Sequence, residues 1–167
     1  MDASLVRQAE ALVPGLIFSD RQKKGLYGPE LVVIPAGEFT LGAVKGDKAD
    51  TSREKPAHRV KINKPFAISR TEITVAQFRA FVAHSGYRTE AEIRGSSDVF
   101  DLAGGKLVQR PGINWRFDHI GQKAGDGYPV LHVSFKDANA YADWLSARTG
   151  KLYRLPTEAQ WEFVLRA

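Results

Sequence analysis

The sequence of 167 residues contains no cysteine. Without thiols the chain cannot form disulfides, zinc–thiolate sites, a cysteine nucleophile or thiolate-bound copper. Cysteine-free chains occur in oxidising and in reducing compartments, so this absence excludes chemistries without assigning a compartment.

Long apolar runs are also absent. No window approaches the roughly 18 apolar residues that a membrane-spanning helix needs. The first 18 residues, MDASLVRQAEALVPGLIF, lack the basic start and compact apolar run of a secretory signal. We therefore expect no membrane segment and, by default, a cytoplasmic location. Internal repeats and low-complexity tracts are missing too.

The composition is that of a soluble globular protein, with 43% hydrophobic and 26% charged residues. The length suits one domain with a hydrophobic core. The formal net charge is +5, and seven basic residues lie between Lys45 and Lys64. A basic patch can attract nucleic acid, but this stretch has no interleaved aromatic residues for base stacking. Its glycine, proline and aspartate favour a solvated loop, so we do not expect nucleic acid as a partner.

Hydrophobic periodicity predicts a mixture of helices and strands. Residues 3–12 have helical spacing, and 13–30 resemble a linker because proline and glycine recur there. Short strands are expected at 31–34 and 38–41, joined by a turn at 35–37, and again at 58–63 and 66–69.

Three helix starts share one capping arrangement. Thr74 is followed three residues later by Gln77, and Thr157 by Gln160, which predicts a capping box at each. Ser134 is expected to cap a helix with Asp137 in its first turn, where the helix dipole favours an acid. The first two helices should end at Gly86 and Gly150. In the third, we expect Trp161, Val164 and Leu165 to form a buried stripe.

Residues 86–130 form a long irregular region with few periodic apolar runs, and loops of this length are usually functional or mobile. A short hairpin is predicted between 99–102 and 106–110. Trp115 lies in this region, and an aromatic residue in a long loop need not belong to the hydrophobic core. We consider it a candidate for lining a ligand groove, with Arg116 and Tyr87 as companions, beside the alternative that it is a core residue.

Other polar residues are better explained by structure than by chemistry. His132 alternates with apolar neighbours before a helix cap, so we expect a core-edge histidine hydrogen-bonded to backbone. The remaining histidines, His58, His84 and His119, share no ligand spacing, so no metal site is expected.

The carboxylates Glu158 and Glu162 lie one helical turn apart. We assign Glu158 to the helix dipole and Glu162 to a solvent face rather than to a catalytic pair. Trp144 and Trp161 are expected to be core or half-buried anchors.

The motifs PAGEF, EITVAQF, GYRTEAE, PVLHVSF and RLPTEAQWEF follow one another from about Leu31 to the last residue. Together and in this order they resemble the formylglycine-generating enzyme, or sulfatase-modifying factor, family. The resemblance implies an α+β fold of the C-type-lectin-like kind, with little regular structure and long loops. It assigns PAGEF to the first hairpin and residues 31–167 to the N-terminal portion of the family domain. Residues 1–30 lie outside the resemblance, and we interpret them as an N-terminal helix and linker.

The best-known members of the family oxidise a cysteine of a nascent sulfatase to formylglycine, using oxygen and a copper(I) ion held by two cysteines. Thiolates are the soft ligands that suit copper(I). In the family the cysteines and the calcium-binding loops lie downstream of the RLPTEAQWEF segment. No catalytic or metal position can therefore be carried over to this chain. We expect it to hold no cofactor and to be unable to form formylglycine as it stands.

Two main hypotheses follow. The chain is either a cysteine-free, non-catalytic module that binds a protein, peptide or other ligand, or the N-terminal part of a family oxidase. The last helix begins with a cap and an apolar stripe but shows no end signal, which favours an incomplete domain whose partner is its C-terminal half. Nucleic-acid binding through the basic loop is a weaker third alternative.

Overall fold

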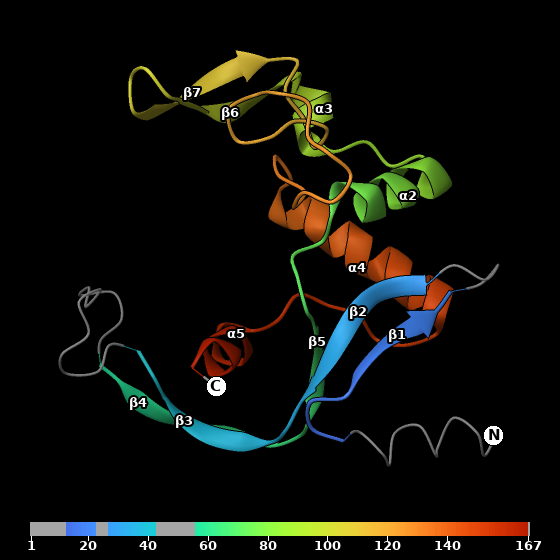
Figure 1. Ribbon diagram of the computed structural model, residues 1–167, viewed down its shortest axis with the longest axis vertical. Coiled ribbons are helices and arrows are strands. Elements are labelled where there is room, and N and C mark those ends of the chain that lie inside the picture. The colour runs from blue at the N-terminus through green and yellow to red at the C-terminus, as the bar shows by residue number, and fades with distance from the viewer. Residues whose placement is uncertain (1–12, 23–26, 43–55, 167) are drawn as a thin grey trace. The chain divides into compact units, whose positions relative to one another are not determined.

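The computed structural model describes residues 13–22, 27–42 and 56–166. By its internal contacts the chain divides into two compact units. Unit 1 contains the described residues of 13–18, 31–68 and 156–166, and unit 2 those of 19–30 and 69–155. The elements are labelled in Figure 1. The helix predicted at 3–12 and most of the basic loop lie outside the described residues.

A three-stranded sheet has the order β1-β2-β5, with β1 at Ile17–Arg21, β2 at Tyr27–Ile34 and β5 at Phe66–Ser69. The strands predicted at 31–34 and 66–69 are confirmed. The linker predicted over 13–30 is wrong, because this segment contains β1 and the start of β2. Gly28 and Pro29 suggested a loop, yet both lie within β2, where Pro29 is buried.

In unit 1, strand β3 (Gly37–Leu41) pairs antiparallel with β4 (His58–Ile62). The predicted hairpin between 31–34 and 38–41 is therefore wrong, although both strands exist. The physical reason is that β2 lies between β1 and β5, so neither of its edges is open to β3.

Helix α5 (Glu158–Leu165) packs against β3 and β4 in the same unit. The rings of Phe39 and Phe163 lie 5.4 Å apart. Glu162 accepts a hydrogen bond from the backbone N–H of Gly42 at 3.0 Å and pairs with Arg166 at 2.6 Å. The solvent face predicted for Glu162 is thus wrong.

The stripe predicted on α5 is also only partly right. Trp161 and Leu165 are 57% and 68% exposed, whereas Val164 is half-buried. The side of the helix that faces β3 is occupied by Phe163 and Glu162, which turns Trp161 outward. Trp161 is therefore not the core or half-buried anchor that we expected.

Unit 2 is built around α2 (Val75–Ser85) and α4 (Phe135–Thr149), which contact each other. Both predicted ends are confirmed: Thr74 and Ser134 cap the helices through complete capping boxes, and Gly86 and Gly150 end them in the left-handed conformation. The buried core of the unit comprises Val75, Phe78, Phe81, Trp115, Ala124, Tyr141 and Leu145.

The region 86–130 is more regular than its sequence indicates. It contains a short helix, α3 (Glu90–Arg94), and a hairpin of β6 (Ser96–Asp101) with β7 (Lys106–Pro111), which are seen beside each other in Figure 1. A hairpin was predicted here, and its strands are longer in the structure than the predicted ranges 99–102 and 106–110. The helix was not predicted, although Thr89 and Glu92 form the same capping box as in the longer helices.

Candidate ligand-binding site

Asp137 is a carboxylate of unit 2 that accepts hydrogen bonds from three separate residues. It is fully buried and accepts hydrogen bonds from the backbone N–H of Ser134 at 2.8 Å and of Glu90 at 3.1 Å. The hydroxyl of Tyr87 donates a third bond to it at 3.0 Å. The N-terminus of α4 is thereby joined to the start of α3. The sequence predicted only the helix-dipole role of this residue.

Tyr87, one of the predicted site residues, is half-buried between this carboxylate and the ring of Phe81 at 5.2 Å. Burial, the hydrogen bond to Asp137 and the charges of Asp137 and Glu90 raise the pKa of Tyr87 to about 12. Its hydroxyl therefore remains a donor throughout the physiological range.

Trp115, the second predicted site residue, lies in the core. It is 1% exposed, and its ring contacts that of Phe78 at 5.6 Å. Its indole N–H is the one buried side-chain polar atom without a hydrogen-bond partner among the described residues. The ring thus offers almost no surface to a ligand.

Arg116, the third predicted residue, is exposed. Its guanidinium lies 4.2 Å from the centre of the Trp115 ring and pairs with Glu92 at 2.6 Å. Burial alone would raise the pKa of Glu92, but hydrogen bonds from Thr89 and Arg116 lower it below its usual value. Of the three predicted residues, Arg116 contacts α3 through Glu92. Their binding of a ligand stays a prediction.

His132 is the only non-glycine residue with positive φ in the described part of the chain, at 59°. Its Nε2 lies 2.8 Å from the carbonyl oxygen of Asp118, and its Nδ1 lies 3.1 Å from the hydroxyl of Ser97. The first contact is the backbone hydrogen bond that we predicted. Both contacts hold the ring in place despite the unfavourable backbone conformation.

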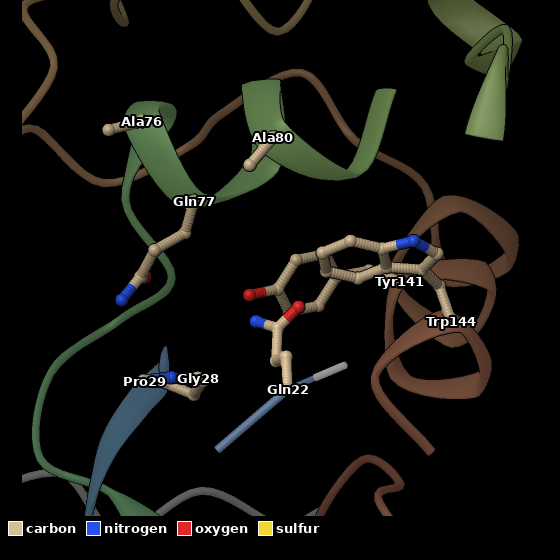
Figure 2. Close-up of a pocket in the computed structure, with 8 residues that line it drawn as sticks. All are labelled: Gln22, Gly28, Pro29, Ala76, Gln77, Ala80, Tyr141 and Trp144. Carbon is tan, nitrogen blue, oxygen red and sulfur yellow. The ribbon is translucent and has the colours of Figure 1, made fainter. Parts of the chain in front are cut away.

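A cleft of about 210 Å³ lies within unit 2. Helix α2 and helix α4 provide most of its walls, and the remainder comes from β2 and from Gln22, the residue after β1. Figure 2 shows how these side chains surround the cleft, which is lined by Gln22, Gly28, Pro29, Ala76, Gln77, Ala80, Tyr141 and Trp144. The sequence does not indicate this site, because Tyr141 and Trp144 have the helical spacing typical of a core stripe.

Ring contacts and one hydrogen bond position the aromatic wall of the cleft. The ring of Tyr141 lies 5.8 Å from that of Trp144 and 5.9 Å from that of Phe78. The indole N–H of Trp144 donates to Nδ1 of His84 at 3.2 Å. Trp144 is half-buried, as predicted. Burial raises the pKa of Tyr141, which keeps its hydroxyl protonated at neutral pH.

The residues present do not suit the metals that the family resemblance implies. Copper(I) prefers thiolates, and the sequence contains none. Among the described residues, no group of three or more histidine, aspartate or glutamate side chains is placed to hold a metal ion.

Comparison with known proteins identifies the class. The family model described as "Sulfatase-modifying factor enzyme 1-like domain" matches residues 18–167. The solved structure of PvdO from Pseudomonas aeruginosa superposes with a TM-score of 0.66 and 33% identity, over 90% of this chain and 51% of that one. The chain belongs to the sulfatase-modifying factor family, and its mixed α/β architecture agrees with the expected fold.

Two curated relatives illustrate the range of the family. A formylglycine-generating enzyme of Streptomyces coelicolor is 37% identical over 95% of this chain and 52% of its own length. A protein of Bos taurus named "Inactive C-alpha-formylglycine-generating enzyme 2" is 38% identical over 81% of this chain and 48% of its own length. The chain thus spans about half the length of these relatives. In its described part, no helix has both the length and the apolar character needed to cross a membrane.

Proposed function

We propose that these 167 residues form the binding scaffold of a sulfatase-modifying-factor domain and do not oxidise cysteine by themselves. The observation that carries this proposal is that the chain contains no cysteine while it spans about half of its relatives. Copper(I) chemistry of the family type requires thiolate ligands, which residues outside this chain would have to supply.

The relatives support a scaffold role in a second way. An enzyme at 37% identity and a protein named inactive at 38% identity match the chain almost equally well. Similarity to this segment is therefore found in relatives with and without the named activity. This supports a segment that binds and positions rather than one that reacts.

We further propose a protein partner for unit 1, either the remaining part of a family domain or a separate polypeptide. Trp161 and Leu165 expose apolar surface on α5, and large exposed apolar side chains that cluster on one element are typical of interaction surfaces. The partner surface on α5 belongs to unit 1 and does not include any residue of the cleft in unit 2.

The oxidation test uses a peptide that carries the sulfatase cysteine, incubated with copper(I) and oxygen and analysed by mass spectrometry. The Streptomyces coelicolor enzyme serves as the positive control. We expect no conversion by the chain alone. Formylglycine formation by the purified chain would overturn the proposal, because the reaction would then need no added thiolates.

The alternative is that the chain is the N-terminal part of an oxidase, which the named enzymes among its relatives favour. It is tested by adding the C-terminal half of the Streptomyces coelicolor enzyme to the chain. Conversion that requires both pieces would support the oxidase alternative. Absence of conversion, with complex formation verified by size-exclusion chromatography, would support a non-catalytic binding module.

A further inference from the structure

We propose that the cleft in unit 2 binds a small, neutral, planar ligand that carries a carbonyl oxygen, as in an aromatic amide. The carbonyl oxygen would accept a hydrogen bond from the hydroxyl of Tyr141, and the planar body would lie against Trp144. This inference goes beyond the proposed scaffold function and does not depend on it.

The first observation concerns the hydroxyl of Tyr141. The residue is 5% exposed, yet within the described part of the chain its hydroxyl has no hydrogen-bond partner. It is also not among the fully enclosed polar atoms. In Figure 2 the hydroxyl points into the space that the other labelled residues surround. The hydroxyl is thus open to the cleft and can donate a hydrogen bond to an acceptor on a ligand.

The second observation concerns Gln77, a polar residue of the cleft lining. The side-chain oxygen of Gln77 accepts a hydrogen bond from the backbone N–H of Thr74 at 2.9 Å. This bond leaves the amide nitrogen of Gln77 as the group that can serve a ligand. Together with Tyr141 it favours an acceptor rather than a donor on the ligand.

The third observation concerns charge and shape. None of the eight described lining residues is acidic, basic or histidine, which favours a neutral ligand over a phosphate or a carboxylate. Ala76, Ala80 and Pro29 add small apolar surfaces to the cleft, and Trp144 adds an aromatic one. A flat apolar body fits between such surfaces.

The volume limits the size of the ligand. The cleft measures about 210 Å³, and an engineered apolar cavity of about 150 Å³ holds benzene. One aromatic ring with a single polar substituent therefore fills it. Benzamide has this size and a carbonyl oxygen, whereas toluene has the ring without an acceptor.

The test is a titration of the full chain with benzamide and with toluene, followed by NMR shifts of the Trp144 indole and the Ala80 methyl group. For a ligand this small we expect a Kd on the order of 1 mM. Tyr141→Phe should weaken benzamide roughly 5- to 10-fold and leave toluene unchanged. It should not lower the melting temperature, because the hydroxyl has no protein partner to lose.

A pair of alanine variants on α2 gives the matched control. Ala80 lines the cleft and Ala83 is exposed on the same helix outside it. Ala80→Leu should fill the cleft and abolish benzamide binding, whereas Ala83→Leu should leave it unchanged. Equal effects of the two variants, full binding to Tyr141→Phe, or a lower melting temperature of Tyr141→Phe would each overturn the proposal.

Discussion

Single residues in unit 2 join segments that are distant in sequence. Asp137 binds Tyr87 and the backbone of Glu90, which lie 50 and 47 positions before it. A buried carboxylate with three donors is well satisfied, but its removal leaves all three donors without an acceptor. The loop between α2 and α3 therefore depends on one side chain of α4.

Replacement of Asp137 by alanine should lower the free energy of unfolding by about 3 kcal/mol, because three partly buried donors lose their acceptor and α4 loses part of its capping box. Urea denaturation followed by circular dichroism measures the change. Asp143→Ala is the matched control: this aspartate is exposed on the same helix, and its loss should change stability by less than about 0.5 kcal/mol. Equal losses in the two variants would contradict the role of Asp137.

Tyr87 makes stability depend on pH in the alkaline range. Its pKa is raised to about 12 in the folded protein, against about 10 in an unfolded chain. The folded state therefore holds the proton more tightly. The resulting stabilisation is complete below about pH 10 and is lost as the pH rises towards 12.

Tyr87→Phe should be less stable than the parent chain at neutral pH, because it loses the bond to Asp137. The difference between the two melting temperatures should shrink between about pH 10 and pH 12. Thermal unfolding at a series of pH values measures both curves, and the other tyrosines cancel in the difference. A gap that stays constant up to pH 12 would contradict this assignment.

A residue's role could be predicted from the sequence when its hydrogen-bond partner lies close to it along the chain. The caps at Thr74, Ser134 and Thr157 were predicted because each partner lies three residues away. The backbone contact of His132 followed from its alternation with apolar neighbours. The bonds of Asp137 to Tyr87 and Glu90, and the hydroxyl of Tyr141 facing a cleft, arise from tertiary packing, and no local pattern indicates them.

Among the elements, α3 shows the limit of periodicity. Its five residues are too few to display a repeating apolar face. The motif T-E-A-E, Thr89 to Glu92, does contain a capping box. The sequence therefore carries the signal for a helix start, but the helix is too short to show a repeating apolar pattern. In α5, by contrast, the start was predicted correctly, but the buried side was assigned to Trp161 rather than to Phe163.

The packing of α5 on β3 requires a residue without a side chain at Gly37. A Cβ atom there would lie 2.7 Å from Cζ of Phe163. We expect Gly37→Ala to lower stability by about 1–3 kcal/mol through overpacking. The measurement is urea denaturation followed by the fluorescence of Trp161 on α5.

A double variant separates this contact from a general effect on β3. Phe163→Leu shortens the ring that meets the new methyl group, so the combined Gly37→Ala and Phe163→Leu change should cost less than the sum of the single changes. Strictly additive costs would show that the close approach of Gly37 to Phe163 is not the cause.

At the scale of the whole molecule, the family and fold class were predictable, whereas the pairing of strands was not. The motifs appeared in family order, and the comparisons confirm the family. The position of β2 between β1 and β5 decides which strands pair, and it depends on residues 17–21, whose proline- and glycine-rich surroundings suggested a linker. Whether a segment forms a strand depends mainly on its local sequence, whereas the order of strands in a sheet depends on segments distant in sequence.

The net charge of +5 does not by itself predict nucleic-acid binding. In the described part of the basic segment, Arg59 and Lys61 both pair with Glu38, at 3.2 and 3.7 Å. We therefore expect no measurable binding of duplex DNA at 0.15 M salt up to about 100 μM protein. A fluorescence-anisotropy titration at several salt concentrations, with Glu38→Gln as the variant that releases both cations, provides the test. Tight binding that falls steeply with rising salt would contradict the expectation.

The pairing of Asp20 has a consequence for synthesis on the ribosome. Its carboxylate binds the ammonium group of Lys151 and the hydroxyl of Tyr153, which lie 131 and 133 positions later in the chain. At ordinary translation rates this interval takes roughly 10 s. For that time the Asp20 carboxylate lacks both of these side-chain partners. We therefore expect this part of unit 2 to become complete only after Tyr153 has been added to the chain.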